Sequence, residues 1–254
     1  MRKVFIAAAV SMVLLLLPAS AGAIANGQPD GNDHPFVGML AFYDGSGAYL
    51  HRCTGTLMSA RVVLTASHCT FGTSSVRVYF DPEVTADYRN GEGGVVGTPV
   101  THPAFNPNTL ENDLAVVELH AAAGVAGPYP TLPGEGFLSR LKRAHELQDD
   151  RFVAVGYGGV PQFPPPIITF DLLRRKAASN YGGLTRNNLH LHQNPNPDGA
   201  GGTCFGDSGG PHFWKRTLKV VAVTSWGDAI CRTNDMTQRL DIASAQRFLA
   251  DHGL

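Results

Sequence analysis

A serine lies between glycines in the hexapeptide Gly-Asp-Ser-Gly-Gly-Pro at residues 206–211. Small neighbours let a substrate approach the hydroxyl of Ser208 closely, and backbone N–H groups of such a segment can point at one oxygen atom. A serine hydroxyl is a poor nucleophile at neutral pH, so a base must take its proton as it attacks. The motif predicts a nucleophile and requires partners elsewhere in the chain.

Two upstream segments supply a base and an acid. His68 lies in Leu-Thr-Ala-Ser-His-Cys at residues 64–69, and Asp113 lies in Asn-Asp-Leu-Ala-Val-Val at residues 112–117. An imidazole titrates near neutral pH and can accept the proton of Ser208. A carboxylate can fix the imidazole tautomer and stabilise the imidazolium. The three side chains predict hydrolysis through an acyl-enzyme on Ser208.

The chain order His, Asp, Ser resembles the chymotrypsin/trypsin family of serine proteases and is the reverse of the α/β-hydrolase order. The resemblance extends from Ile24 to the C-terminal segment. It implies an all-β fold of two six-stranded antiparallel β-barrels with the active site between them, plus a C-terminal helix. The implied activity is that of a secreted serine endopeptidase.

The resemblance also implies two sets of substrate contacts. The backbone N–H groups of Gly206 and Ser208 would form the oxyanion hole, which holds the negative oxygen of the tetrahedral intermediate. The segment Ser225-Trp226-Gly227 would pair with an extended substrate as an antiparallel strand. Ser225 would in addition hydrogen-bond Asp113.

The sequence allows two interpretations of the enzyme's preference for the substrate residue before the scissile bond (P1). In trypsin-like enzymes an aspartate six positions before the nucleophile pairs with Arg or Lys, whereas this chain has Gly202, with Thr203 beside it. We therefore expect a neutral, aromatic or aliphatic P1 residue, with Phe205 covering the pocket rim. Asp235 is the alternative, because it could reach the pocket and restore a basic preference.

The N-terminal region contains a predicted signal peptide and a predicted activation segment. Residues 1–23 carry Arg2 and Lys3 near the start, continue with a largely apolar stretch of 14 residues and end in Ala-Gly-Ala, as in a secretory signal. A membrane anchor is the competing interpretation, and the apolar stretch is short for it. In the family a new N-terminal ammonium inserts beside the aspartate before the nucleophile, here Ile24 and Asp207. Signal cleavage before Ile24 would then release active enzyme without a zymogen stage.

Four cysteines in a secreted chain indicate two disulfides, for which three pairings exist. Zinc ligation is the competing interpretation, but no C-x-x-C motif is present. The resemblance implies the pairs Cys53–Cys69 and Cys204–Cys231.

Composition limits the partners and cofactors. Charged residues make up 16 % of the chain, the formal net charge is −1, and no basic tract suggests nucleic acid. We expect a monomer without cofactor or membrane contact after signal removal, acting on protein or peptide substrates and subject to protein inhibitors. Asp81, Glu83 and Asp87 lie roughly where some relatives bind calcium, but their spacing alone is too weak to predict a metal site.

Short alternating or β-branched runs separated by Gly, Pro, Asn and Asp clusters are typical of an all-β barrel or sandwich. A helix is expected at residues 244–254. The proline-containing segment 124–136 is the expected linker between units at 24–125, with His68 and Asp113, and 126–254, with Ser208. The predicted strands are residues 36–42, 61–66, 75–80, 114–119, 152–157, 189–192 and 218–225.

Two other classes of function remain open. One is a catalytically silent binding protein of the same family, which the intact triad opposes. The other is an α/β-hydrolase esterase or lipase, supported only by the G-x-S-x-G pattern around Ser208. Its acid and base would have to come from residues such as Asp228, Asp241 and His252.

Overall fold

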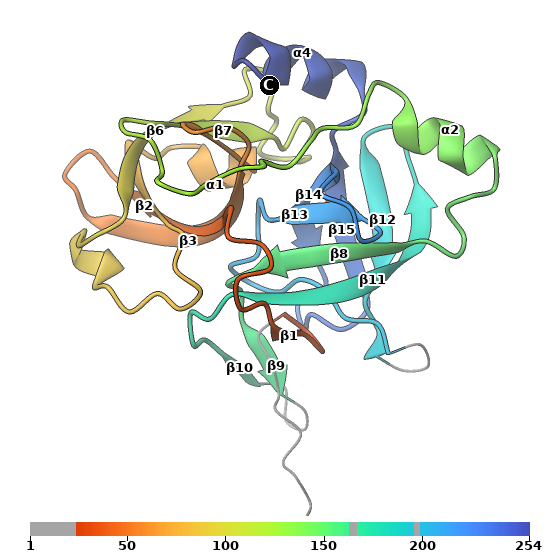
Figure 1. The fold of residues 1–254 in the computed structure, drawn as a ribbon, viewed down its shortest axis with the longest axis horizontal. Helices are drawn as coiled ribbons and strands as arrows, with labels where there is room; N and C mark the ends of the chain where they lie inside the picture. The colour runs from red at the N-terminus through yellow and green to blue at the C-terminus, as the bar shows by residue number, and fades with distance from the viewer. Residues whose placement is uncertain (1–23, 163–166, 196–198) are drawn as a thin grey trace, which may run out of the picture.

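The computed structural model describes residues 24–162, 167–195 and 199–254, and the predicted signal peptide therefore lies outside the described residues. The described chain forms two antiparallel β-barrels side by side (Figure 1). The first is closed in the strand order β2-β3-β4-β7-β6-β5. Its strands are β2 (Val37–Tyr43), β3 (Tyr49–Leu57), β4 (Val62–Thr65), β5 (Ser75–Tyr79), β6 (Val95–Thr101) and β7 (Ala115–Leu119).

The second barrel closes where β8 and β11 pair, with the strand order β11-β12-β15-β14-β13-β8. The short strand β1 (Gln28–Pro29) joins its β11 edge, and β9 (Val160–Gln162) and β10 (Ile167–Thr169) form a separate hairpin. The barrel strands are β8 (Arg151–Gly156), β11 (Arg175–Leu184), β12 (Asn188–His192), β13 (Pro211–Trp214), β14 (Val220–Gly227) and β15 (Asn234–Arg239). The predicted all-β fold of two six-stranded barrels is confirmed.

Helices occupy little of the described chain. The single turn α1 (Ser67–Thr70) carries His68, and the 3-10 turn η1 covers Tyr88–Asn90. Helix α2 (Phe137–Arg143) follows the connecting segment, and α4 (Ala243–Asp251) packs Phe248 and Leu249 into the core at the top of Figure 1. In the described residues no helix is long and apolar enough to cross a membrane.

Each predicted strand overlaps an observed strand, and the predicted C-terminal helix overlaps α4. The prediction omitted β3, β6, β11, β13, β15 and α2. Strand β3 contains His51, Arg52 and Thr54, so its sequence lacks a clean apolar alternation. Helix α2 is too short for a clear helical period. Tertiary contacts stabilise it instead, because Leu138 packs in a hydrophobic cluster and its N–H donates to the Asp241 carboxylate. The division at residues 125 and 126 stays a prediction.

Buried Arg174 links the N-terminal segment to both barrels. Its guanidinium donates to the carboxylate of Asp30 at 3.1 Å and to the carbonyl of Gly31 at 2.9 Å. It also donates to the carbonyl of Phe80 in the first barrel at 2.9 Å and to the hydroxyl of Tyr157 at 3.2 Å. Because Tyr157 directly follows β8 of the second barrel, one side chain fixes three parts of the fold together.

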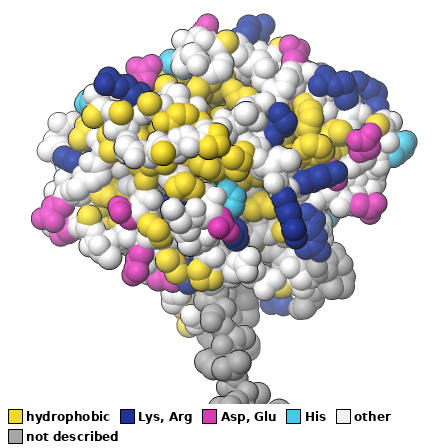
Figure 2. Space-filling view, in the orientation of Figure 1, with side chains coloured by type: hydrophobic (Ala, Val, Ile, Leu, Met, Phe, Trp, Pro, Cys, Tyr) yellow, Lys and Arg dark blue, Asp and Glu magenta, His cyan; other side chains and the backbone are white. Residues whose placement is uncertain are grey.

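Hydrophobic side chains cover much of the middle of the face in Figure 2, and Lys and Arg side chains gather over the second barrel near β8 and β11. Several basic side chains of this region are paired. Lys176 on β11 forms ion pairs with Asp33 and Asp30, and Lys215 pairs with Asp150 at 2.9 Å. Carboxylates therefore compensate the charge of these two lysines.

Candidate active site

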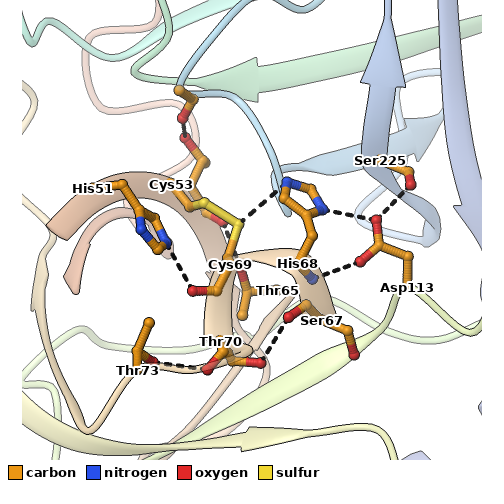
Figure 3. Close-up of a disulfide and its surroundings, with 12 residues drawn as sticks. His51, Cys53, Thr65, Ser67, His68, Cys69, Thr70, Thr73, Asp113 and Ser225 are labelled. Atoms are coloured by element: carbon orange, nitrogen blue, oxygen red, sulfur yellow. Dashed lines mark hydrogen bonds and ion pairs between the residues drawn. A yellow bond between two sulfur atoms is a disulfide. The ribbon is translucent and has the colours of Figure 1, made fainter. Parts of the chain in front are cut away.

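Asp113 is fully buried at the junction of the barrels and accepts hydrogen bonds from both predicted partners. Its Oδ2 atom is 2.8 Å from Nδ1 of His68, and its Oδ1 atom accepts the backbone N–H of His68 at 2.8 Å. The hydroxyl of Ser225 donates to Oδ2 at 2.5 Å. Figure 3 shows the His68 ring between this carboxylate and the disulfide. The carboxylate thus fixes the imidazole orientation and leaves Nε2 directed away from it.

Buried contacts hold the turn that carries His68. The hydroxyl of Ser67 donates to the carbonyl of Leu114 at 2.6 Å and accepts the N–H of His102 at 3.2 Å, so it ties α1 to the residue after Asp113. The disulfide Cys53–Cys69 anchors the other side of the turn to β3 (Figure 3). The second disulfide, Cys204–Cys231, joins the Ser208 loop to the segment before β15, and both pairings are those that the resemblance implied.

The Ser208 loop is fastened to the first barrel through Thr54 on β3. The Thr54 hydroxyl donates to the Gly206 carbonyl at 2.9 Å, and its backbone N–H donates to the Ser208 carbonyl at 2.9 Å. A Cβ added to Gly209 would lie 2.7 Å from the backbone nitrogen of Ala66, two residues before His68. The loop and the His68 segment are therefore in direct contact, although no hydrogen bond joins the Ser208 and His68 side chains among the described residues.

Two backbone N–H groups of the loop are unused within the described chain. Those of Gly206 and Ser208 donate to no other described residue, whereas the N–H groups of Asp207, Gly209 and Gly210 all donate to carbonyls. Gly206 has φ +99°, a conformation that residues with a Cβ rarely adopt. The loop geometry thus leaves two donors next to the Ser208 side chain.

Asp207 points away from the substrate side and is fully buried. Its carboxylate accepts the backbone N–H of Gly158 at 2.7 Å and that of Cys204 at 2.9 Å. Burial raises the pKa of Asp207 to about 7, although these hydrogen bonds act in the opposite direction. The carboxylate sits in a site that would favour a cationic partner.

The N-terminal segment lies against the same loop. Ile24 is 0 % exposed, and Ala25 forms an antiparallel bridge with Gly202, whose N–H donates to the Ala25 carbonyl at 3.0 Å. Ala25 also packs in a cluster with Cys204 and Cys231. The segment that begins at Ile24 is thus bonded to the chain just before the Ser208 loop, and in the full chain the Ile24 nitrogen is an uncharged peptide amide.

A cavity of about 210 Å³ opens beside Ser208. The exposed side chains of Phe205 and Trp226 stand at its mouth, and the nearly buried Thr203 and Thr224 line it more deeply. The predicted substrate residues Thr203, Phe205, Ser225, Trp226 and Gly227 all line this cavity, whereas the sixth, Gly202, does not. The remaining lining residues are Cys204, Ser208, Thr224, Asp228 and Cys231.

Gly202 and Asp235 both lie behind the cavity wall. A Cβ on Gly202 would be 2.2 Å from the Gln193 side-chain oxygen, so the space beneath this glycine is already filled. Asp235 is 0 % exposed, and its Oδ2 atom lies 3.2 Å from Nε2 of the equally buried His212. His212 Nε2 also lies 3.1 Å from the hydroxyl of Thr224, which separates the pair from the cavity.

Of the residues proposed for an α/β-hydrolase site, Asp228 lines the cavity beside Ser208, where it accepts three backbone N–H groups, and the other two lie elsewhere. Asp241 pairs with Arg239, and His252 pairs with Glu118 at 3.1 Å, so neither supplies an acid or base for an α/β-hydrolase site. That alternative is wrong on the fold as well, because α/β-hydrolases need a sheet covered by helices. Among the described residues, the only three potential metal ligands within 4.8 Å of one another are Cys53, His68 and Cys69, and the two sulfurs form a disulfide.

Sequence reasoning missed three residues that position the site. Thr54 donates to the Gly206 carbonyl in the Ser208 loop, and Gln238 accepts the Asp113 N–H at 3.2 Å. Ser67 has no predicted role, yet its hydroxyl joins two segments. None of the three stands in a motif that marks a bonding partner, because each partner is far away in the sequence.

Comparisons with known proteins agree with this geometry. Residues 24–245 match the family described as Trypsin. Serine protease 1 of Drosophila melanogaster is 27 % identical over 224 residues, covering 82 % of this chain and 77 % of that protein. Trypsin of Saccharopolyspora erythraea is 28 % identical over 208 residues, covering 79 % and 84 %.

A solved structure titled HL collagenase, at 1.7 Å resolution, aligns with a TM-score of 0.68 and 18 % identity. The alignment covers 90 % of this chain and 98 % of that one, and it supports the fold of two barrels. The match to the family over nearly the whole described chain, together with the triad geometry, shows that this protein belongs to the trypsin family and is a serine endopeptidase.

Proposed function

We propose that the protein is a secreted endopeptidase that cleaves peptide bonds through an acyl-enzyme on Ser208, with a neutral P1 residue. The observation that carries the proposal is the fully buried Asp113 carboxylate, which accepts the N–H and Nδ1–H of His68 and the hydroxyl of Ser225. This arrangement leaves Nε2 of His68, which lies 3.7 Å from the disulfide sulfur of Cys69, as the base. A rotation of the Ser208 side chain toward Nε2 would complete the relay when substrate binds.

In the first step His68 would take the proton of Ser208 as its oxygen attacks the substrate carbonyl carbon. His68 would then give that proton to the leaving amine, and the C–N bond would break to leave an ester on Ser208. A water molecule, deprotonated by His68, would hydrolyse the ester. Throughout, Asp113 would stay ionised and stabilise the imidazolium.

We assign the oxyanion hole to the N–H groups of Gly206 and Ser208, because they donate to no other described residue. Substrate residues before the scissile bond would pair with Ser225-Trp226-Gly227, where Trp226 is exposed and β14 ends. Removing one oxyanion donor in related hydrolases costs about 3–4 kcal/mol of transition-state stabilisation.

Three observations support a neutral P1 residue. The cavity has hydroxyl groups of Thr203 and Thr224 in its deeper part, and Gly202 offers no charge. Asp235 lies 3.2 Å from Nε2 of His212, does not line the cavity, and has no hydrogen bond to either carboxylate oxygen among the described residues. The one carboxylate that lines the cavity, Asp228, already accepts three backbone N–H groups at 2.8–3.0 Å.

We further propose that a free ammonium on Ile24 is the ion-pair partner of Asp207. Ile24 is buried, its neighbour Ala25 is bonded to Gly202, and the Asp207 carboxylate accepts two backbone N–H groups but forms no ion pair within the described chain. Signal cleavage directly before Ile24 would produce that ammonium without a separate activation cleavage. Secretion accords with the two disulfides. Protein inhibitors and a monomeric state are further expectations.

Peptides that vary only at P1 test the proposal. The enzyme is produced by secretion from the full chain, and Ser208→Ala protein serves as the blank. Faster cleavage after Phe, Tyr or Leu than after Arg or Lys supports the neutral pocket. A preference for Arg or Lys would contradict the P1 assignment, and absence of Ser208-dependent cleavage of any peptide would contradict the acyl-enzyme mechanism.

A further inference from the structure

We propose that Arg52 is a specificity-determining residue that binds an acidic side chain on the leaving-group side of the scissile bond. The enzyme would then prefer substrates with Glu or Asp at one of the two positions after that bond, P1′ or P2′. This inference rests on the proposed function of Ser208. It concerns a residue outside the P1 cavity and outside the triad.

The direction of the Arg52 side chain follows from strand β3. Residues two apart on a strand point to the same face, so Arg52 points the same way as Thr54. The Thr54 hydroxyl donates to the carbonyl of Gly206. A Cβ built on Gly206 would lie 3.5 Å from both Nε and Nη2 of Arg52. The guanidinium therefore lies against the residue to which we assign an oxyanion donor.

Arg52 forms no ion pair within the described part of the chain, although the Asp207 carboxylate is near enough for the positive charge to lower its pKa. The Nε atom of Arg52 is buried without a hydrogen-bond partner, while the side chain as a whole is half-buried beside the hydroxyl of Tyr49. The buried arginines of the described chain differ, because each forms an ion pair with an aspartate; they are Arg174, Arg175 and Arg239. Arg52 therefore keeps N–H donors that no carboxylate of the described chain binds, and beside the nucleophile these donors indicate a site for an incoming anion.

An exposed aromatic ring holds the guanidinium in place. The Cζ atom of Arg52 lies 4.4 Å from the ring centroid of Phe170, which follows β10 and is 48 % exposed. Stacking on a ring restricts the guanidinium plane and leaves its edge to bind a carboxylate through two N–H groups. A lysine could supply the charge but neither the stacking nor the paired donors.

The position of Arg52 places it on the side of the active site that binds the leaving group of the substrate. The residues that we assign to the acyl half of the substrate, the cavity and Ser225-Trp226-Gly227, come from the second barrel. Arg52 does not line that cavity, belongs to the first barrel and precedes Cys53, whose disulfide partner follows His68. The substrate chain crosses Ser208 from one barrel to the other, so the residues after the scissile bond face Arg52.

The test uses peptides that share the best P1 residue and differ only in Glu, Gln or Lys at P1′ or at P2′. We expect wild-type enzyme to cleave the Glu peptide about tenfold faster in kcat/KM than the Gln peptide at one of these positions, the equivalent of one charge-assisted pair. Arg52→Gln should remove the preference, Arg52→Lys should retain only part of it, and Arg52→Glu should reverse it in favour of Lys.

Two controls separate this inference from other effects. Arg89→Gln makes the same charge change in the first barrel, where Arg89 lies near the rings of Tyr49 and Tyr88, and should leave the Glu preference intact. A substrate with the same P1 residue and a p-nitroanilide leaving group has no P1′ or P2′ side chain. The kcat/KM of each peptide is divided by the kcat/KM of this substrate, which removes any general effect of the variant on activity.

The outcomes are distinct from those that test the proposed function. Wild-type enzyme that cleaves the p-nitroanilide but shows equal rates on Glu and Gln peptides overturns the role of Arg52 alone. An equal loss of kcat/KM on all substrates in Arg52→Gln also overturns it. Arg52 would then act through Asp207, because its charge lowers the pKa that burial raises. Absence of p-nitroanilide cleavage by wild-type enzyme contradicts the proposed function itself.

Discussion

Replacement of Arg174 by Met should be among the most destabilising single changes outside the site. The guanidinium is 0 % exposed and donates to the carboxylate of Asp30 and to the carbonyls of Gly31, Val37 and Phe80. Methionine keeps much of the volume but supplies no donor. The variant therefore leaves a buried carboxylate with weaker partners and removes the side-chain donor to the carbonyls of Gly31 and Phe80, whereas the Val37 carbonyl keeps the Tyr157 hydroxyl.

The magnitude follows from these contacts. Loss of one partner from a buried ion pair costs about 3–5 kcal/mol. Asp30 keeps His34 at 2.6 Å and Lys176 at 3.8 Å, which lowers the cost, but each orphaned buried carbonyl adds about 1–3 kcal/mol. Since such terms do not add fully, we expect a loss of about 3–5 kcal/mol, or about 6–20 °C in Tm for a chain of this size.

Urea and thermal unfolding of Arg174→Met at pH 7 give the measurement. Lys215→Met is the matched control, because Lys215 is 48 % exposed and its pair with Asp150 should contribute at most about 1 kcal/mol. Burial opposes the charge of Asp30, but His34 and Arg174 outweigh it and lower the pKa. This stabilisation is present above the unfolded pKa of about 3.9 and is lost as pH falls through the lower folded value, so the difference between variant and wild type should shrink there. A loss of less than 1 kcal/mol at pH 7 would refute the reasoning.

Three further predictions concern the site. In a form with one extra residue before Ile24, the pKa of Asp207 should stay near 7, so the free energy of unfolding should fall as pH rises from about 4 to 7. The form that begins at Ile24 should not show this fall, and denaturant titrations at several pH values compare the two forms. Ser225→Ala removes one donor to the buried triad carboxylate and should lower kcat/KM about tenfold or more in peptide assays, and an unchanged rate would disprove its positioning role. Gly209→Ala should abolish activity and destabilise the fold, because its Cβ would lie 2.1 Å from a threonine hydroxyl at φ +76°. The control Gly31→Ala, at φ +60° with open space around it, should cost only about 1 kcal/mol, and equal unfolding midpoints for the two variants would contradict the steric argument.

Sequence patterns alone predicted the chemistry that we propose, and they predicted the fold class that the structure confirms. Ser208, His68 and Asp113 stand in short motifs whose order differs between families of hydrolases, so their roles could be predicted before any geometry was known. Turn residues between short apolar runs predicted antiparallel strands, because side-chain alternation and turn formation are local properties. The resemblance added the disulfide pairs.

Tertiary structure decided which polar groups are satisfied and by what. Thr54 bonds Gly206 across 152 positions, His212 lies against Asp235, and Arg52 lies against Gly206 in the Ser208 loop. No local pattern carries these facts, because a buried charge or hydroxyl is defined by the strand faces that close around it. For that reason the sequence left Gly202 and Asp235 as open alternatives for P1. The packing of Asp235 against His212, outside the cavity, is what favours a neutral pocket.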